Sequence, residues 1–246
     1  MRMRKKKHGA ERLSACSEFI ADIPDAPMSD PSVLFGRTGA PVYLEIGAGK
    51  GGFAAKMAKR HAEACYLAME RVSDCVVLGA EGAKNMDGGA PTNLKFIVDT
   101  ADNLTRMFAP ASVDAIFLNF SDPWSKKGYA KRRLTHRRYL AVYMNLLKPG
   151  GVLRFKTDND GLFDFSVEEI SAVGLPIVKL TRDLHSSEYA EGNIMTEYET
   201  AFSSQGVKIN MLEVVKPEGF ALEIPDDLRA DRVDRFPKRD DGRYDG

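Results

Sequence analysis

An acid, a proline and a tryptophan follow an apolar run, and a dense group of cations comes next, in residues 119–133 (NFSDPWSKKGYAKRR). The apolar run, residues 113–118, is typical of a buried parallel strand, and ligands in open α/β sheets collect just beyond the carboxyl ends of strands. Asp122 is therefore expected at a site. Trp124, the single tryptophan of the chain, offers a stacking face. Seven cations could hold a phosphate backbone: Lys126, Lys127, Lys131, Arg132, Arg133, Arg137 and Arg138.

This segment indicates chemistry on a nucleobase, because stacking face, backbone cations and carboxylate meet in one loop. The alternative interpretation is a turn with a structural tryptophan and a solvated run of charges.

A glycine cluster in residues 44–52 (LEIGAGKGG) marks a second candidate site. Glycine at Gly47 and Gly49 would let a ligand approach the backbone closely, between a strand and a helix. Glu70, at the end of the next strand, lies where doubly wound folds place an acid that hydrogen-bonds a ribose. The order of strand, glycine turn, helix, strand and acid predicts a nucleotide-type ligand. The alternative is a tight structural turn.

Glu45 favours one of the two kinds of ligand that such a glycine turn commonly binds, a dinucleotide or a cofactor without phosphate. A pyrophosphate would be repelled by this acid, whereas a cofactor with a sulfonium and an α-amino group would tolerate or use it. The pattern resembles the first motif of class I S-adenosylmethionine-dependent methyltransferases. Asp99, at the end of the third strand, fits a partner for the adenine amino group in such folds. Its alternative role is a cap in residues 99–102.

The elements that must position these residues are apolar runs alternating with helical periodicity, which is the pattern of a parallel sheet. A helix is expected over residues 134–147, ended by the Lys-Pro-Gly-Gly of residues 148–151, and another near residues 160–172. Residues 177–180 and 209–215 are candidates for a closing antiparallel pair. The predicted fold is α/β and Rossmann-like, with a mostly parallel seven-stranded sheet and helices on both faces. The other expected strands are residues 42–46, 66–69, 94–98, 113–118 and 152–157.

Length and composition favour one large α/β domain, and the two ends of the chain differ from it in charge. The chain has 246 residues, 43% of them hydrophobic, and a formal net charge of zero, so any nucleic-acid partner must be inferred from local patches. We expect a basic amino-terminal arm and extension in residues 1–33, a methyltransferase domain in residues 34–220 and a charged, flexible tail in residues 221–246. Residues 1–12 and 225–246 look loosely structured.

Three cysteines without metal-ligand spacing argue against a disulfide framework. Neither a signal peptide nor a membrane-spanning run is evident, so a cytoplasmic protein is expected. Neither a metal nor a membrane is expected to take part. Oligomeric state is left open between monomer and homodimer.

Four segments together resemble the bacterial tRNA (guanine-N7-)-methyltransferase family: LEIGAGKGGF, NFSDPWSKK, RFKTDN and GNIMTEYE. The resemblance covers roughly residues 34–215. It implies methylation of guanine N7 at position 46, in the variable loop of tRNA, with S-adenosyl-L-methionine as cofactor. It places Glu45, Glu70, Asp99 and Asp122 around the cofactor, with Asp122 also catalytic. It further implies a tRNA or guanine side formed by Lys126, Asp158, Thr196, Glu197, Tyr198 and Glu199.

The chemistry agrees with the residues present. Guanine N7 carries a lone pair and no proton, so its methylation needs no general base, and none of the four histidines is placed like one. Carboxylates such as Asp122, Asp158 or Glu199 could offset the charge that moves to the purine and accept hydrogen bonds from guanine. Asp158 could equally be a helix N-cap, and Thr196 with Glu199 also fits a capping box. Lys126 could contact base or phosphate.

Three other functions would use part of the same residue pattern. A methyltransferase for exocyclic base amines carries a similar acid-proline-aromatic motif, although usually with two prolines. A nicotinamide-dependent oxidoreductase would use the same glycine turn and Glu70, but Glu45 and the lack of a catalytic Tyr-Lys or His pairing oppose it. A non-catalytic RNA-binding subunit would not need acids at every expected site.

Overall fold

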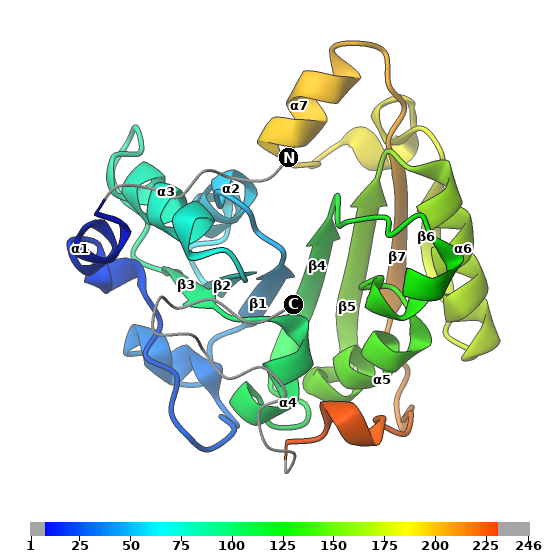
Figure 1. Ribbon diagram of the computed structural model, residues 1–246, viewed down its shortest axis with the longest axis horizontal. Coiled ribbons are helices and arrows are strands. Elements are labelled where there is room, and N and C mark those ends of the chain that lie inside the picture. Colours follow the sequence, from blue (N-terminus) through cyan, green and yellow to red (C-terminus); the bar gives the residue numbers. More distant parts are fainter. Residues whose placement is uncertain (1–7, 231–246) are drawn as a thin grey trace.

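A seven-stranded sheet forms the centre of the protein, whose structure is a computed structural model describing residues 8–230 (Figure 1). The strand order is β3-β2-β1-β4-β5-β7-β6. Neighbouring strands are parallel except that β7 runs antiparallel to both β5 and β6. The strands are β1 (Val42–Ile46), β2 (Cys65–Glu70), β3 (Leu94–Val98), β4 (Val113–Asn119), β5 (Leu147–Thr157), β6 (Ile177–Thr181) and β7 (Asn210–Val215).

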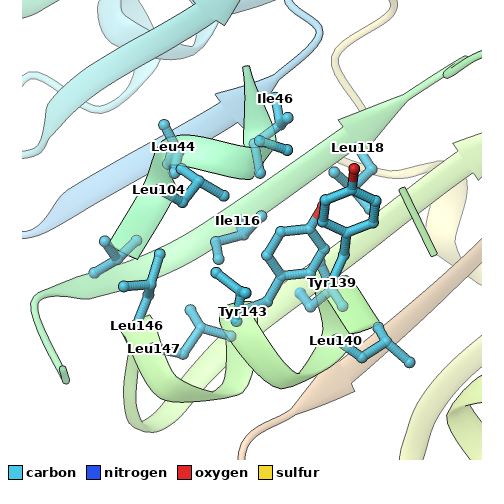
Figure 2. Close-up of a cluster of buried hydrophobic side chains, with 14 of the residues drawn as sticks. Leu44, Ile46, Leu104, Ile116, Leu118, Tyr139, Leu140, Tyr143, Leu146 and Leu147 are labelled. Atoms are coloured by element: carbon cyan, nitrogen blue, oxygen red, sulfur yellow. The ribbon is translucent and has the colours of Figure 1, made fainter. Parts of the chain in front are cut away.

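Helices cover both faces of this sheet (Figure 1). One face is covered by α2 (Gly52–Arg60) and α3 (Ser73–Lys84), and the other by α4 (Leu104–Met107), α5 (Arg137–Leu146) and α6 (Asp160–Ala172). Figure 2 shows part of the second layer, where Tyr143 of α5 packs with Ile116 of β4 and Leu44 of β1. Two short helices, α1 (Gly9–Ser14) and α7 (Glu197–Ser203), lie outside these layers.

The pleat of the central strands decides which polar side chains are enclosed. In β1, Leu44 faces the layer of α4 to α6, so its neighbour Glu45 must face the layer of α2 and α3. Glu45 pairs in register with Ala68 and Phe117, which both belong to the α2 and α3 core. A carboxylate is thus placed inside an apolar layer by the alternation of the strand.

The predicted fold class is confirmed, including the antiparallel pair that closes the sheet. The stop predicted at residues 148–151 differs in detail, because α5 ends at Leu146 and these residues already belong to β5. Leu147 pairs with Val113, and a register irregularity follows before Val152 pairs with Ala115. Gly150, at φ +77°, turns the strand so that its N–H donates to the Lys216 carbonyl. The irregularity lets a strand continue through a sequence typical of a turn.

Both described ends of the chain pack on the domain. Near the amino terminus, Ile20 forms a bridge with Phe96 of β3, and Arg12 donates two hydrogen bonds to Glu81 of α3. Near the carboxyl terminus, Leu228 is 1% exposed, and its carbonyl accepts a 2.6 Å hydrogen bond from Thr105. The expectation of loose structure is therefore wrong for residues 9–12 and 225–230. Residues 1–7 and 231–246 lie outside the described residues, and the domain boundaries stay a prediction.

Leu228→Ala is expected to lower the free energy of unfolding by about 2–4 kcal/mol, as is typical when a buried leucine is truncated. Urea unfolding of the full chain measures it. Leu180→Ala is the matched control, because Leu180 is 45% exposed and its truncation should cost much less. Equal losses in the two variants would mean that the carboxyl-terminal segment does not pack as described.

Candidate active site

The loop from β1 to α2 is open on its outer side. Gly47, Gly49 and Gly51 have φ values of +82°, +56° and +69°, a region that favours glycine. A Cβ atom built at Gly47 or Gly49 would meet nothing within 4 Å, whereas one at Gly51 would lie 2.5 Å from the Phe96 ring. The first two glycines therefore expose backbone to a ligand, and the third allows the loop to pack on the sheet.

Glu70 ties this loop to the next one. Its Oε2 accepts a 3.0 Å hydrogen bond from the Gly49 N–H, and its Oε1 accepts a 2.9 Å bond from the Val72 N–H. Each carboxylate oxygen has a further lone pair. Glu70 can thus order both loops and still accept a hydrogen bond from a ligand hydroxyl.

Glu45 is a buried acid with one oxygen unused. Its side chain belongs to a residue only 2% exposed, and its Oε1 accepts a 2.8 Å hydrogen bond from Asn119 at the end of β4. Its Oε2 has no hydrogen-bond partner among the described residues. Burial raises the pKa of Glu45 to about 8, against the opposing effects of the Asn119 hydrogen bond and the charge of Lys156. A buried acceptor without a donor is costly, so this oxygen fits a cationic or hydrogen-bonding ligand group.

Asp99 follows β3 and is held by its own turn. Its Oδ1 accepts hydrogen bonds from the Thr100 N–H at 2.7 Å and from Asn103 at 2.8 Å. The cap of the following short helix is Thr100, whose hydroxyl accepts from the Asp102 N–H. The second oxygen of Asp99 makes no hydrogen bond within residues 8–230 and is available to a ligand amine.

Asp122 stands on an exposed turn after β4. Its side chain is 71% exposed, and its Oδ2 lies 3.9 Å from the Arg71 guanidinium, which comes from the loop after β2. Trp124 has a φ of +42°, and the Arg132 guanidinium lies 5.0 Å from the ring centroids of both Trp124 and Tyr129. The turn thus presents a carboxylate beside two aromatic rings that meet edge to face and a guanidinium that contacts both.

Three of the seven cations predicted to face phosphates have other partners. Arg133 donates to the carbonyls of Pro123 and Trp124, which fixes the turn. Arg137 binds Glu169 through two hydrogen bonds, and Arg138 binds Asp227. Four cations remain at the exposed loop: Lys126, Lys127, Lys131 and Arg132.

The segment containing α7 lies between the glycine loop and β5. Thr196 and Glu199 form a capping box at the start of α7, as the spacing indicated. Glu197 lies 4.0 Å from Lys50 of the glycine loop, and the Tyr198 hydroxyl donates a 3.0 Å hydrogen bond to Asp158. Lys126, by contrast, stands exposed on the opposite loop.

Glu199 does not face this open side. It is 0% exposed, and its Oε2 lies 2.5 Å from the Lys156 ammonium. The expectation that Glu199 itself accepts hydrogen bonds from guanine is therefore not supported by its position, because its carboxylate is turned into the protein.

Sequence reasoning missed Asn119, Lys156 and Arg71. Asn119 and Lys156 stood within the motifs NFSDPWSKK and RFKTDN, which was the one available signal. Their partners come from distant parts of the chain, so their contacts follow from the fold alone.

A separate cleft of about 450 Å³ lies beside β5 and β6 and includes none of the predicted site residues. Two of its cations, Arg154 and Lys179, both bind Glu213, which leaves little reason to assign a ligand there. Residues 8–230 contain no group of three or more acidic, histidine or cysteine side chains suited to a metal ion. No helix in the same range is long and apolar enough to cross a membrane.

The strand order and an open glycine loop between β1 and α2 define a class I methyltransferase fold. Residues 39–212 match the family model "Putative methyltransferase". A tRNA (guanine-N(7)-)-methyltransferase of Lachnoclostridium phytofermentans is 40% identical over 204 residues, which are 83% of this chain and 94% of that protein. The chain therefore belongs to the tRNA (guanine-N7-)-methyltransferase family, as the four sequence segments predicted.

Two solved structures show the same fold at low sequence identity. The 16S rRNA methyltransferase KamB has a TM-score of 0.55 and 13% identity, covering 88% of this chain and 96% of its own. An antibiotic-related methyltransferase has a TM-score of 0.52 and 16% identity, covering 87% and 96%. Identities this low establish shared architecture and leave substrate choice to the site.

Proposed function

We propose that this protein transfers the methyl group of S-adenosylmethionine to N7 of guanine in tRNA, at the variable-loop position 46. The observation that carries the cofactor assignment is Glu45, a buried carboxylate with an unpartnered oxygen in the strand that leads into the open glycine loop. A dinucleotide would bring a pyrophosphate towards this acid. S-adenosylmethionine brings a sulfonium and an ammonium group instead. The 40% identity to a tRNA (guanine-N(7)-)-methyltransferase supports this cofactor.

The residues present fit this cofactor at each of its parts. Glu70 would accept from the ribose hydroxyls, and Asp99 would accept from the adenine amine with its free oxygen. Gly47 and Gly49 would leave room beside the backbone for the methionine portion. Bound there, the cofactor supplies an electrophilic methyl group on a positively charged sulfur.

In the reaction, the residues of this chain would orient guanine N7 relative to the methyl group and would balance the charge that develops on the purine. Guanine N7 attacks with its lone pair, so no protein group has to remove a proton. Holding the nucleophile in line with the methyl group supplies much of the rate, since effective molarities of about 10⁵–10⁸ M come from orientation. As the bond forms, positive charge moves onto the purine. Asp122, on the turn beside the carboxyl ends of β1 and β4, would stabilise that charge.

The guanine side would be formed by Asp158, Tyr198 and the loop after β4. Asp158 keeps one carboxylate oxygen beyond its bond to Tyr198, and it would accept from the N1 and N2 donors of guanine. Trp124 and Tyr129 would stack on unpaired bases, Arg132 would contact phosphate, and Lys126 would contact phosphate or base. Thr196 and Glu197 would shape the edge next to the glycine loop.

Labelled S-adenosylmethionine with unmodified tRNA tests the proposal directly. We expect one labelled methyl group per tRNA. Chemical cleavage specific for N7-methylguanosine should then break the RNA chain at position 46. A transcript with adenine at position 46 should accept no label. Label on an exocyclic amine, or none in RNA, would overturn the assignment.

Lys131→Ala combined with Arg132→Ala should weaken tRNA binding and flatten its dependence on salt. Each phosphate contact contributes about 0.7–0.9 to the slope of log affinity against log salt, so two lost contacts should reduce it by about 1.4–1.8. Binding at several salt concentrations measures it, with affinity for S-adenosylmethionine unchanged. Lys208→Ala with Lys179→Ala is the matched control, since both lysines lie away from the loop and pair with acids. A slope equal to that of the wild type would mean that the loop cations are solvated and do not contact tRNA phosphates.

A further inference from the structure

Lys156 and Glu199 form an ion pair that is closed off from solvent. Their side chains are 1% and 0% exposed, and the ammonium lies 2.5 Å from Glu199 Oε2. Lys156 also donates to the Asn193 side chain at 3.2 Å and to the Ile194 carbonyl at 3.0 Å. The Asn193 amide in turn donates to Glu199 Oε1 at 2.7 Å. Each charge is thus satisfied by several partners, as a buried pair requires.

This pair joins the end of β5 to the start of α7. Glu199 Oε2 also accepts from the Thr196 N–H at 3.3 Å, so the carboxylate that binds Lys156 is the one that completes the capping box. Because α7 has only seven residues, it is too short to be stable without such support. The position of α7 therefore depends on Lys156.

The residues next to Glu199 reach both halves of the proposed site. Tyr198 binds Asp158, which follows Lys156 by two positions, and its ring lies 4.9 Å from Phe120 and 4.1 Å from Phe202 between centroids. Glu197 lies against the glycine loop, where a Cβ on Gly52 would be 3.3 Å from its Oε1. A shift of α7 would therefore move groups on the cofactor side and on the guanine side together.

We propose that Lys156 and Glu199 are positioning residues that fix α7, so that Tyr198 holds Asp158 in place for guanine, and that neither residue touches tRNA. This inference rests on the proposed function. It gives Glu199 a role different from direct contact with the substrate.

A purely stabilising role explains the pair less well. A buried ion pair is commonly no more stabilising than apolar residues of similar volume. The aromatic ring of Phe53 lies beside this pair, with its centroid 5.2 Å from the Lys156 ammonium, and the hydrogen-bonding partners of the pair are polar. Burial lowers the pKa of Lys156, and Glu199 opposes that shift. Charges kept at this cost fix a geometry that apolar side chains would not specify.

Glu199→Gln, Tyr198→Phe and the double variant form the test. We expect Glu199→Gln to lower kcat on tRNA about 10- to 100-fold, because small misplacements of a positioned group cost that much. Affinity for S-adenosylmethionine should stay within about twofold. Since both residues act through Asp158, the double variant should be little slower than the slower single variant. Asp164→Asn is the control, because it breaks an exposed ion pair with Arg182.

A second variant separates positioning from stability. Lys156→Met with Glu199→Gln removes both charges and should regain much of the thermal stability lost by Glu199→Gln alone, while kcat stays low. If Glu199→Gln fails to fold, the neutral pair Lys156→Met with Glu199→Gln takes its place, and the inference then requires low kcat in that folded protein.

The outcomes distinguish the inference from the proposed function. Absence of tRNA methylation by the wild-type protein would overturn the proposed function. Methylation by wild type, with normal kcat in Glu199→Gln, or with multiplicative losses in the double variant, would overturn only the positioning role. Recovery of both kcat and thermal stability in the variant Lys156→Met with Glu199→Gln would also overturn only the positioning role.

Discussion

Asp122→Asn is expected to lower kcat on tRNA by about 100-fold while affinity for S-adenosylmethionine falls much less. Asparagine keeps the shape of the turn but removes the negative charge that would balance the methylated purine, and single groups of this kind are typically worth 10²–10³ in kcat. Single-turnover methylation at saturating tRNA measures the chemical step apart from binding. Asp87→Asn, at an exposed position on the loop before β3, is the matched control and should leave kcat unchanged.

The pH profile provides a second measurement on the same variant. With no proton to remove from N7, the wild-type kcat should show no ionisation step attributable to a histidine between pH 6 and 8. His136 illustrates why: burial lowers its pKa, and its Nδ1 accepts from the Arg138 N–H as the cap of α5. Wild-type turnover in Asp122→Asn, or a histidine-like step in kcat, would contradict the proposed chemistry.

The sheet could be predicted because its central strands are buried on both faces. Val113 to Leu118 and the run around Leu44 are nearly continuous in apolar residues, which is the pattern of parallel strands covered by helices. The closing strand β7 is predictable for the same reason, since Met211, Leu212 and Val214 are buried, whereas no residue of the edge strand β6 is fully buried. Strands that are buried can therefore be predicted, because burial requires apolar residues along the strand.

Partners brought together by the fold left no comparable pattern. The spacing of Thr196 and Glu199 predicts a capping box, but nothing in it reveals that Lys156 binds the same carboxylate from 43 positions away. Arg133, Arg137 and Arg138 are indistinguishable in sequence from the four neighbouring cations of the loop, which have no acidic or carbonyl partner within residues 8–230. Leu228 is one apolar residue in a charged stretch, yet it reaches the core. Such cases depend on tertiary contacts that local composition does not contain.

Glu45→Gln is expected to weaken S-adenosylmethionine binding by about 30-fold or more, because it removes a buried charge that would face a cationic ligand. The effect should have a proton signature. The pKa of Glu45 is raised to about 8 by burial, so the ligand-free side chain is mostly protonated at pH 7. Binding of a cation favours the ionised form, and the wild-type protein should therefore release close to one proton when S-adenosylmethionine binds.

Calorimetric titration at pH 7 in two buffers of different ionisation enthalpy counts this proton. Wild type should give different heats in the two buffers, and Glu45→Gln should lose that difference, since the ligand's own amine is common to both titrations. Glu63→Gln is the control, because Glu63 is largely exposed. The pH dependence of the free energy of unfolding tests independently whether folding raises the pKa of Glu45. A carboxyl whose pKa rises from 4.5 to about 8 on folding costs stability as pH increases between those values, so the ligand-free wild type should lose stability over that window and Glu45→Gln should lose less. Equal proton release in both proteins would place the ionised carboxylate elsewhere and remove Glu45 from the cofactor site.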